Sequence, residues 1–146
     1  MASGSADGTV RVWNMETYSK VWEFEHEDEV NCVQLHNKWL ISSSDDKTTR
    51  IWNRHTGKET HRLVHKDSCT NFDLSPDKSI LAVGCGNGVV LWDFRNAKKL
   101  KEFKLRQSVE DLRFNPTGDR LVFGSRDGRV FKIDLAYDYR NENEES

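Results

Sequence analysis

The sequence predicts an all-β protein built from repeated units of short strands. Similar dipeptides recur at a nearly constant period, and short β-prone runs alternate with turn residues. No long stretch shows the 3.6-residue apolar period of a helix. The recurring dipeptides are Trp13-Asn14, Trp52-Asn53, Trp92-Asp93 and Ile133-Asp134, at spacings of 39, 40 and 41 residues. A period of this size indicates one supersecondary unit repeated along the chain.

A hairpin signal precedes each of these dipeptides. The four segments are "SADGTVRVWN" (5–14), "SDDKTTRIWN" (44–53), "CGNGVVLWD" (85–93) and "SRDGRVFKID" (125–134). Asp-Gly or Asn-Gly between β-prone runs favours a tight hairpin, because both residues tolerate positive φ. Further short runs, such as "KVWEFE", "VNCVQLH" and "WLISSS", complete each unit, so we expect 14 strands in all.

Four strands in about 40 residues that end on Trp-Asp are typical of a β-propeller blade. The chain resembles the WD-repeat family over residues 1–134, which implies a partial β-propeller of about three and a half blades, followed by a polar acidic tail over 135–146. Residue 1 falls where the second strand of a blade should begin, and the last repeat stops after its third strand. We therefore expect a fragment or short form of a larger propeller protein, with self-association through open blade edges as the alternative.

The resemblance also implies a structural tetrad in each blade. Its members are a His before the first strand, a Ser or Thr in the second, an Asp in the following turn, and the Trp. The first two repeats supply Ser3, Asp7 and Trp13, and then the full set His26, Ser42, Asp46 and Trp52. The third keeps His65 and Trp92, with Val83 and Asn87 at the other two positions, and the fourth keeps only Asp127.

Composition excludes several classes of protein. The net charge of −2 offers no general attraction to nucleic acid or to an anionic membrane. No apolar stretch is long enough to span a bilayer, and the first ten residues lack the apolar core of a signal peptide. The three cysteines are odd in number and widely spaced, which argues against a disulfide framework. We expect an intracellular location, cytoplasmic or nuclear.

Two motifs suggest chemistry that the repeat explains otherwise. His61, His65 and Cys69 have a spacing that zinc ligands can show. The repeat instead puts His61 on an outer strand, His65 at the His position of the tetrad and Cys69 at the start of the next strand, so we expect no metal. The glycines from Gly84 to Gly88 suggest a nucleotide-binding enzyme, but a phosphate loop needs a helix after it and "VVLWDF" reads as strand. We expect a shortened hairpin centred on Asn87-Gly88, no cofactor and no enzymatic activity.

A run of basic residues over 95–107 has two interpretations. It is either a patch for phosphate or an acidic partner, or a solvated outermost strand whose charges discourage edge pairing. We favour the outermost strand, because no aromatic residues are interleaved for base stacking.

The resemblance to the WD-repeat family implies a rigid scaffold that binds proteins or peptides on the face carrying the hairpin and inter-blade loops. The charged candidates in these loops are Glu27, Asp28, Asp45, Lys66, Asp67, Arg106 and Arg126. Their mixed sign favours a polar peptide or a partner with both charges over nucleic acid.

The segment 26–53 is also similar to repeats in the F-box/WD substrate receptors of ubiquitin ligases. Receptors of that group that read phosphorylated peptides place arginines at fixed blade positions, of which only Arg126 is an arginine here. We expect no phosphate-dependent binding to this chain.

Overall fold

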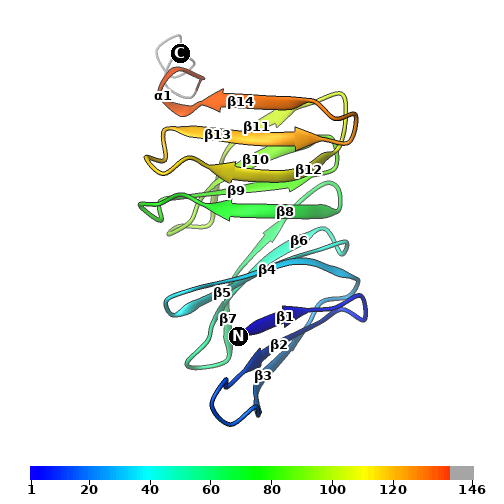
Figure 1. Ribbon diagram of the computed structural model, residues 1–146, viewed down its shortest axis with the longest axis vertical. Coiled ribbons are helices and arrows are strands. Elements are labelled where there is room, and N and C mark those ends of the chain that lie inside the picture. Colours follow the sequence, from blue (N-terminus) through cyan, green and yellow to red (C-terminus); the bar gives the residue numbers. More distant parts are fainter. Residues whose placement is uncertain (139–146) are drawn as a thin grey trace. The chain divides into compact units, whose positions relative to one another are not determined.

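The computed structural model describes residues 1–138, and in this part of the chain 14 strands form four antiparallel sheets (Figure 1). The strands of the first two sheets are β1 (Ala2–Gly4), β2 (Thr9–Trp13), β3 (Lys20–Glu25), β4 (Val30–His36), β5 (Trp39–Ser44), β6 (Thr48–Asn53) and β7 (Lys58–Val64). Those of the other two are β8 (Cys69–Leu74), β9 (Ile80–Cys85), β10 (Gly88–Asp93), β11 (Lys98–Lys104), β12 (Val109–Phe114), β13 (Arg120–Ser125) and β14 (Val130–Asp134). The predicted all-β class is confirmed.

Each sheet is a simple up-and-down meander. Sheets β4-β5-β6-β7 and β8-β9-β10-β11 have four strands, whereas β1-β2-β3 and β12-β13-β14 have three. The arrangement therefore supplies about three and a half propeller blades. A single turn of helix, α1 (Leu135–Asp138), follows β14. The remainder of the predicted acidic tail, 139–146, lies outside the described residues.

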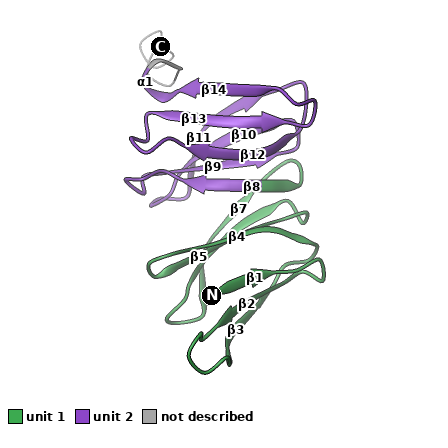
Figure 2. Ribbon diagram, viewed as in Figure 1, with its two compact units in different colours: residues 1–70 green, residues 71–146 purple. Residues whose placement is uncertain are grey.

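The chain divides into two compact units, residues 1–70 and 71–146 (Figure 2). In the first unit, Val10 and Phe24 of one sheet pack against Val30, Leu40 and Trp52 of the next. The rings of Phe24 and Trp52 stack at 4.5 Å between centroids. These side chains alternate along their strands, so a period-2 apolar pattern places them on one face of each sheet.

The second unit is built in the same way from its own residues. Val89 and Leu91 of β10 lie in one core cluster with Leu121, Phe123 and Ile133 of the three-stranded sheet. Ile133 stands where the other repeats have Trp and is buried among these aliphatic side chains. Packing therefore replaces the polar contacts that the Trp of a complete tetrad would make.

The hairpin between β9 and β10 differs from the one that the sequence suggests. The register pairs Gly88 with Cys85, so the loop consists of Gly86 and Asn87, and the predicted centre at Asn87-Gly88 is wrong. Gly86 takes the positive φ of 51° that a two-residue hairpin of this kind needs at its first loop position. The β5–β6 loop keeps three residues and places Lys47 at a φ of 65° instead.

Candidate functional site

The hairpins and the connections between sheets meet at one end of the strands, and backbone hydrogen bonds join them. In the first unit, the β3–β4 connection bonds to the β1–β2 hairpin through His26 N–H and Gly8 O, 2.9 Å apart. The same connection accepts from the β5–β6 hairpin, where Asp45 N–H donates to Glu29 O at 2.9 Å. Because these loops hold one another in place, the side chains that they carry have defined positions. We call this surface the loop face.

The second unit repeats the arrangement with its own loops. Leu105 N–H donates to Asn87 O at 2.7 Å, and Arg126 N–H donates to Ser108 O at 3.1 Å. The β11–β12 connection is therefore tied to the hairpins on both sides of it, as the β3–β4 connection is in the first unit.

A buried chain of polar side chains lies beneath the loop face of the first unit. Trp52 Nε1 donates to Ser42 Oγ at 3.1 Å, and Ser42 Oγ lies 2.7 Å from His26 Nε2. On the other side of the ring, His26 Nδ1 lies 2.8 Å from Asp46 Oδ2. A neutral His26 protonated on Nδ1 satisfies all of these contacts at once, because Ser42 then donates to Nε2 and the carboxylate accepts from Nδ1.

The pKa values of the two ionisable groups agree with this proton arrangement. Burial lowers the pKa of His26 below its usual value, against the opposing pull of the Asp46 carboxylate. Burial alone would raise the pKa of Asp46, but hydrogen bonds from Thr48, His26 and the backbone of Glu27 outweigh it and hold that pKa well below its usual range. The pair is therefore a neutral imidazole beside a carboxylate at pH 7.

Arg50, which the sequence reasoning did not single out, completes the network. Its guanidinium lies 3.0 Å from Asp46 Oδ2 and 3.7 Å from Glu59 Oε2, and it also donates to Glu25 O at 3.0 Å. Its side chain is 7% exposed, so this positive charge is buried beside two carboxylates. The sequence did hold a signal for it, because the first repeat carries the same Asp-x-Thr-x-Arg pattern from Asp7 to Arg11.

The repeats recognised in the sequence match a known family model. The model described as "WD domain, G-beta repeat" matches residues 1–14, 18–53, 57–93 and 97–134. The chain belongs to the WD-repeat family. A search of the curated proteins finds no match.

The first WD repeat forms a more exposed version of the network. Trp13 Nε1 donates to Ser3 Oγ at 3.0 Å. Asp7 lies apart from this pair at the tip of the hairpin, where its Oδ1 accepts from the N–H and the hydroxyl of Thr9 at 2.9 and 2.6 Å. These hydrogen bonds lower the pKa of Asp7, as the matching bonds from Thr48 do for Asp46.

The later repeats depart further from the tetrad. His65 is buried, and its Nε2 lies 3.1 Å from Thr49 Oγ1 on β6, a contact that the family pattern did not suggest. Asp127 accepts from the hydroxyl of Ser125 and from Arg129 N–H, so it organises its own hairpin. A Ser two residues before the hairpin Asp recurs in three repeats, and this is a signal that the sequence reasoning missed.

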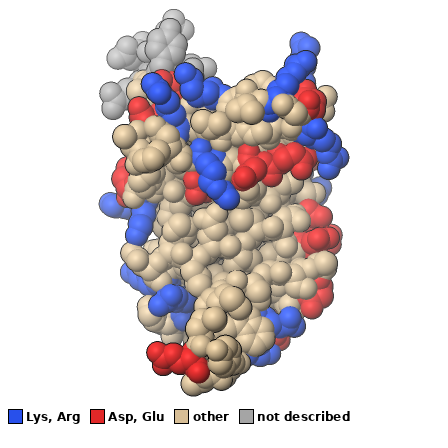
Figure 3. Space-filling model, viewed as in Figure 1, with Lys and Arg blue, Asp and Glu red and all other residues tan. Residues whose placement is uncertain are grey.

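The candidate contact residues all lie in the loops that form the loop face of their own unit. Glu27, Asp28, Lys66 and Asp67 of the first unit are exposed, and so are Arg106 and Arg126 of the second. Asp45 is partly buried, and its Oδ1 accepts from Asn31 Nδ2 at 2.7 Å. Arg126 Nε lies 3.1 Å from Glu110 Oε1, so the one arginine at a phosphate-reader position already faces a carboxylate. Figure 3 shows side chains of both signs, mainly in the upper part and along the edges of the face that it displays.

The residues of the two alternative chemical motifs lie on the following elements. His61 lies on β7, the outermost strand of its sheet, whereas His65 is in the following loop and Cys69 begins β8. Gly84 is in β9 and Gly88 in β10, so the residues after the glycines form a strand rather than the helix that a phosphate loop needs. Among the described residues, no helix is long and apolar enough to cross a membrane.

Proposed function

We propose that this WD-repeat chain is a non-catalytic, intracellular scaffold that binds a protein or peptide partner on its loop face. WD-repeat domains in general serve as protein-interaction scaffolds. The observation that carries the proposal is the set of backbone hydrogen bonds that tie the inter-strand connections to the hairpins in both units. Exposed charged side chains on such fixed loops can contact a partner without the cost of ordering a mobile segment.

The charges favour a partner with both signs. In the first unit Glu27 and Lys66 are exposed on neighbouring connections of the loop face, and in the second unit Arg106 and Arg126 are exposed. A polar peptide with basic and acidic side chains matches this pattern better than a uniformly negative nucleic acid. The alternative is that the chain recognises substrates for a ubiquitin ligase. It rests only on the resemblance of the second repeat to repeats of the F-box/WD substrate receptors.

A charge-reversal pair tests the loop face. Glu27→Lys combined with Lys66→Glu keeps the net charge and changes only exposed side chains. The matched control is Glu16→Lys with Lys58→Glu. Both residues are exposed, and Glu16 in the β2–β3 turn and Lys58 at the start of β7 lie at the other end of the strands from the loop face. Partners captured from a cell lysate by the wild-type chain should be lost with the loop-face pair and kept with the control. Equal capture by both variants would contradict the proposal.

Self-association through the open sheet edges stays a prediction. Light scattering across a range of concentrations measures the mass of the chain directly. A mass that stays at that of one chain over the whole range would refute self-association and leave the loop-face proposal unaffected.

A further inference from the structure

The strand β11 forms the outer edge of a sheet whose four strands all lie in the described part of the chain. On its outer side it has no neighbouring strand among these residues. Four of its seven residues are lysines and one is a glutamate, and Arg95 lies in the turn just before it. The basic run noted in the sequence therefore follows this strand edge along its whole length.

The outermost strands of the first unit are charged in a different way. β3 has one lysine and two glutamates, and β7 has one glutamate between a lysine and an arginine. Carboxylates of both strands pair with cations of the same sheet, since Glu23 lies 2.7 Å from Arg11 Nε and Glu59 lies 2.8 Å from Arg62 Nε. Mixed charges of this kind already discourage edge pairing. Protection of the edge alone therefore does not explain why β11 is almost uniformly basic.

Three of the cations along this edge are exposed to solvent and are not used within the sheet. Arg95, Lys98 and Lys104 form no ion pair among the described residues, whereas Lys99 pairs with Glu102. A carboxylate of a partner that binds these three side chains therefore does not have to displace a carboxylate of the chain itself.

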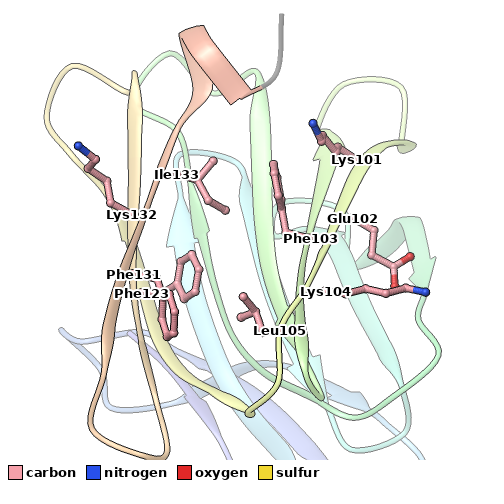
Figure 4. Close-up of a pocket in the computed structure, with 9 residues that line it drawn as sticks. All are labelled: Lys101, Glu102, Phe103, Lys104, Leu105, Phe123, Phe131, Lys132 and Ile133. Carbon is pink, nitrogen blue, oxygen red and sulfur yellow. The ribbon is translucent and has the colours of Figure 1, made fainter. Parts of the chain in front are cut away.

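A segment that lies along this edge would meet cations from one end to the other. The register pairs Lys98 with Asp93 and Lys104 with Gly88, the last and the first residue of β10. Six residue steps of a strand span about 20 Å, so an extended segment of about seven residues reaches from one lysine to the other. Lys101 and Lys104 are three residues apart on a regular stretch of strand and lie on opposite faces, and in Figure 4 they point in different directions. Basic side chains thus flank the edge on both faces of the sheet.

Cross-strand pairs decide which kind of strand this edge accepts. A carboxylate opposite a lysine is a favourable pair, whereas a lysine opposite a lysine is unfavourable. The edge therefore favours an acidic strand and disfavours the β11 strand of a second copy. A single-stranded nucleic acid would find no exposed aromatic side chain on β11 for base stacking.

We infer that the outer edge of β11 binds an extended acidic segment of a partner protein, which adds to the sheet as a fifth strand. Main-chain hydrogen bonds to the strand edge supply affinity. Carboxylates of the segment pair with Lys98 at one end of β11 and Lys104 at the other, and these pairs supply specificity. This binding mode uses a sheet edge and is separate from the loop-face proposal, so either can fail without the other.

The probe is a fluorescein-labelled peptide of sequence Glu-Glu-Val-Glu-Val-Glu-Glu, titrated with the full chain at low ionic strength and followed by fluorescence anisotropy. We expect saturable binding below about 1 mM. Two control peptides test the mode: in one, glutamine replaces every glutamate, and the other carries N-methyl groups on alternate amides. Both should bind at least about tenfold more weakly, because the first loses the ion pairs and the second loses the edge hydrogen bonds.

Two double variants locate the site. Lys98→Glu with Lys104→Glu changes exposed side chains and should weaken binding at least about tenfold, because it places like charges opposite each other. Lys38→Glu with Lys58→Glu is the matched control, since it alters the net charge by the same amount at exposed lysines of the first unit. It should leave binding within about twofold of the wild type. Circular dichroism shows whether both variants fold.

Four outcomes would overturn the inference. Equal weakening by the two double variants would show attraction to the net charge alone, and full binding of the N-methylated peptide would show that no strand is added. A seven-nucleotide oligothymidylate that binds more tightly than the probe would assign the edge to nucleic acid. Tighter binding of the probe after deletion of 139–146 would assign the edge to the chain's own acidic tail.

Discussion

Replacement of Ser42 by Ala tests whether the buried polar chain stabilises the first unit. The Ser42 hydroxyl is 0% exposed and holds two groups together, since it accepts from Trp52 Nε1 and donates to His26 Nε2. Its removal leaves one buried donor and one buried acceptor without their partner. Each such group costs about 1–3 kcal/mol, so the variant should lose about 2–6 kcal/mol of its free energy of unfolding.

Ser3→Ala is the matched control, because Trp13 donates to Ser3 through the same bond at 3.0 Å. Ser3 and Trp13 are both only half-buried, so water replaces the lost partner and the cost should stay below about 1 kcal/mol. The assay is urea unfolding at pH 7, followed by tryptophan fluorescence and by circular dichroism, with coincident transitions required before free energies are compared. If Ser42→Ala is no more destabilising than Ser3→Ala, the reasoning about burial is refuted.

Three further predictions follow from the geometry. Burial lowers the pKa of His26 in the folded chain, so near pH 6.5 the unfolded chain takes up a proton that the folded chain does not. The free energy of unfolding should therefore fall as the pH drops below about 6.5. Urea midpoints at pH 7.5 and 5.5 should show a smaller fall in His26→Gln than in the exposed control His55→Gln, and an equal fall in both would count against the neutral imidazole. A Cβ at Gly4 would lie 2.6 Å from a methyl group of Val30, whereas at the register-equivalent Gly124 it would meet nothing within 4 Å. Thermal unfolding should therefore show a loss of about 1–3 kcal/mol for Gly4→Ala and almost no change for Gly124→Ala, and similar effects at both sites would contradict the close packing of β4 on β1. A phosphopeptide library should show no phosphate-dependent binding to the chain, and binding that disappears in Arg126→Ala would show the opposite.

Much of the fold is readable from the sequence because its signals are local and repeated. The period of about 40 residues, the Trp that ends the hairpin in three of the four repeats and the turn dipeptides each indicate a short-range conformation. The predicted segments "VNCVQLH" and "WLISSS" coincide with β4 and β5 in full. The predicted centre of the β9–β10 loop was wrong by one residue. A two-residue loop of this kind needs a positive φ that glycine adopts easily, and the sequence offers a glycine on either side of Asn87, at Gly86 and at Gly88.

The sequence by itself determined the repeat, the all-β class, the family and the loops that carry the charged candidates. Only the tertiary structure decided how those residues are used, because burial and pairing depend on segments that are distant along the chain. Arg50 looks like a solvated strand residue until Asp46 and Glu59 are seen to enclose it. The basic run at 95–107 contains β11, which is an edge strand of its sheet as expected, but only the structure shows the apolar side chains of β13 and β14 across a groove from it (Figure 4). Local propensity places a residue on a strand, but its neighbours across the fold set its charge state, its exposure and the partner that it can bind.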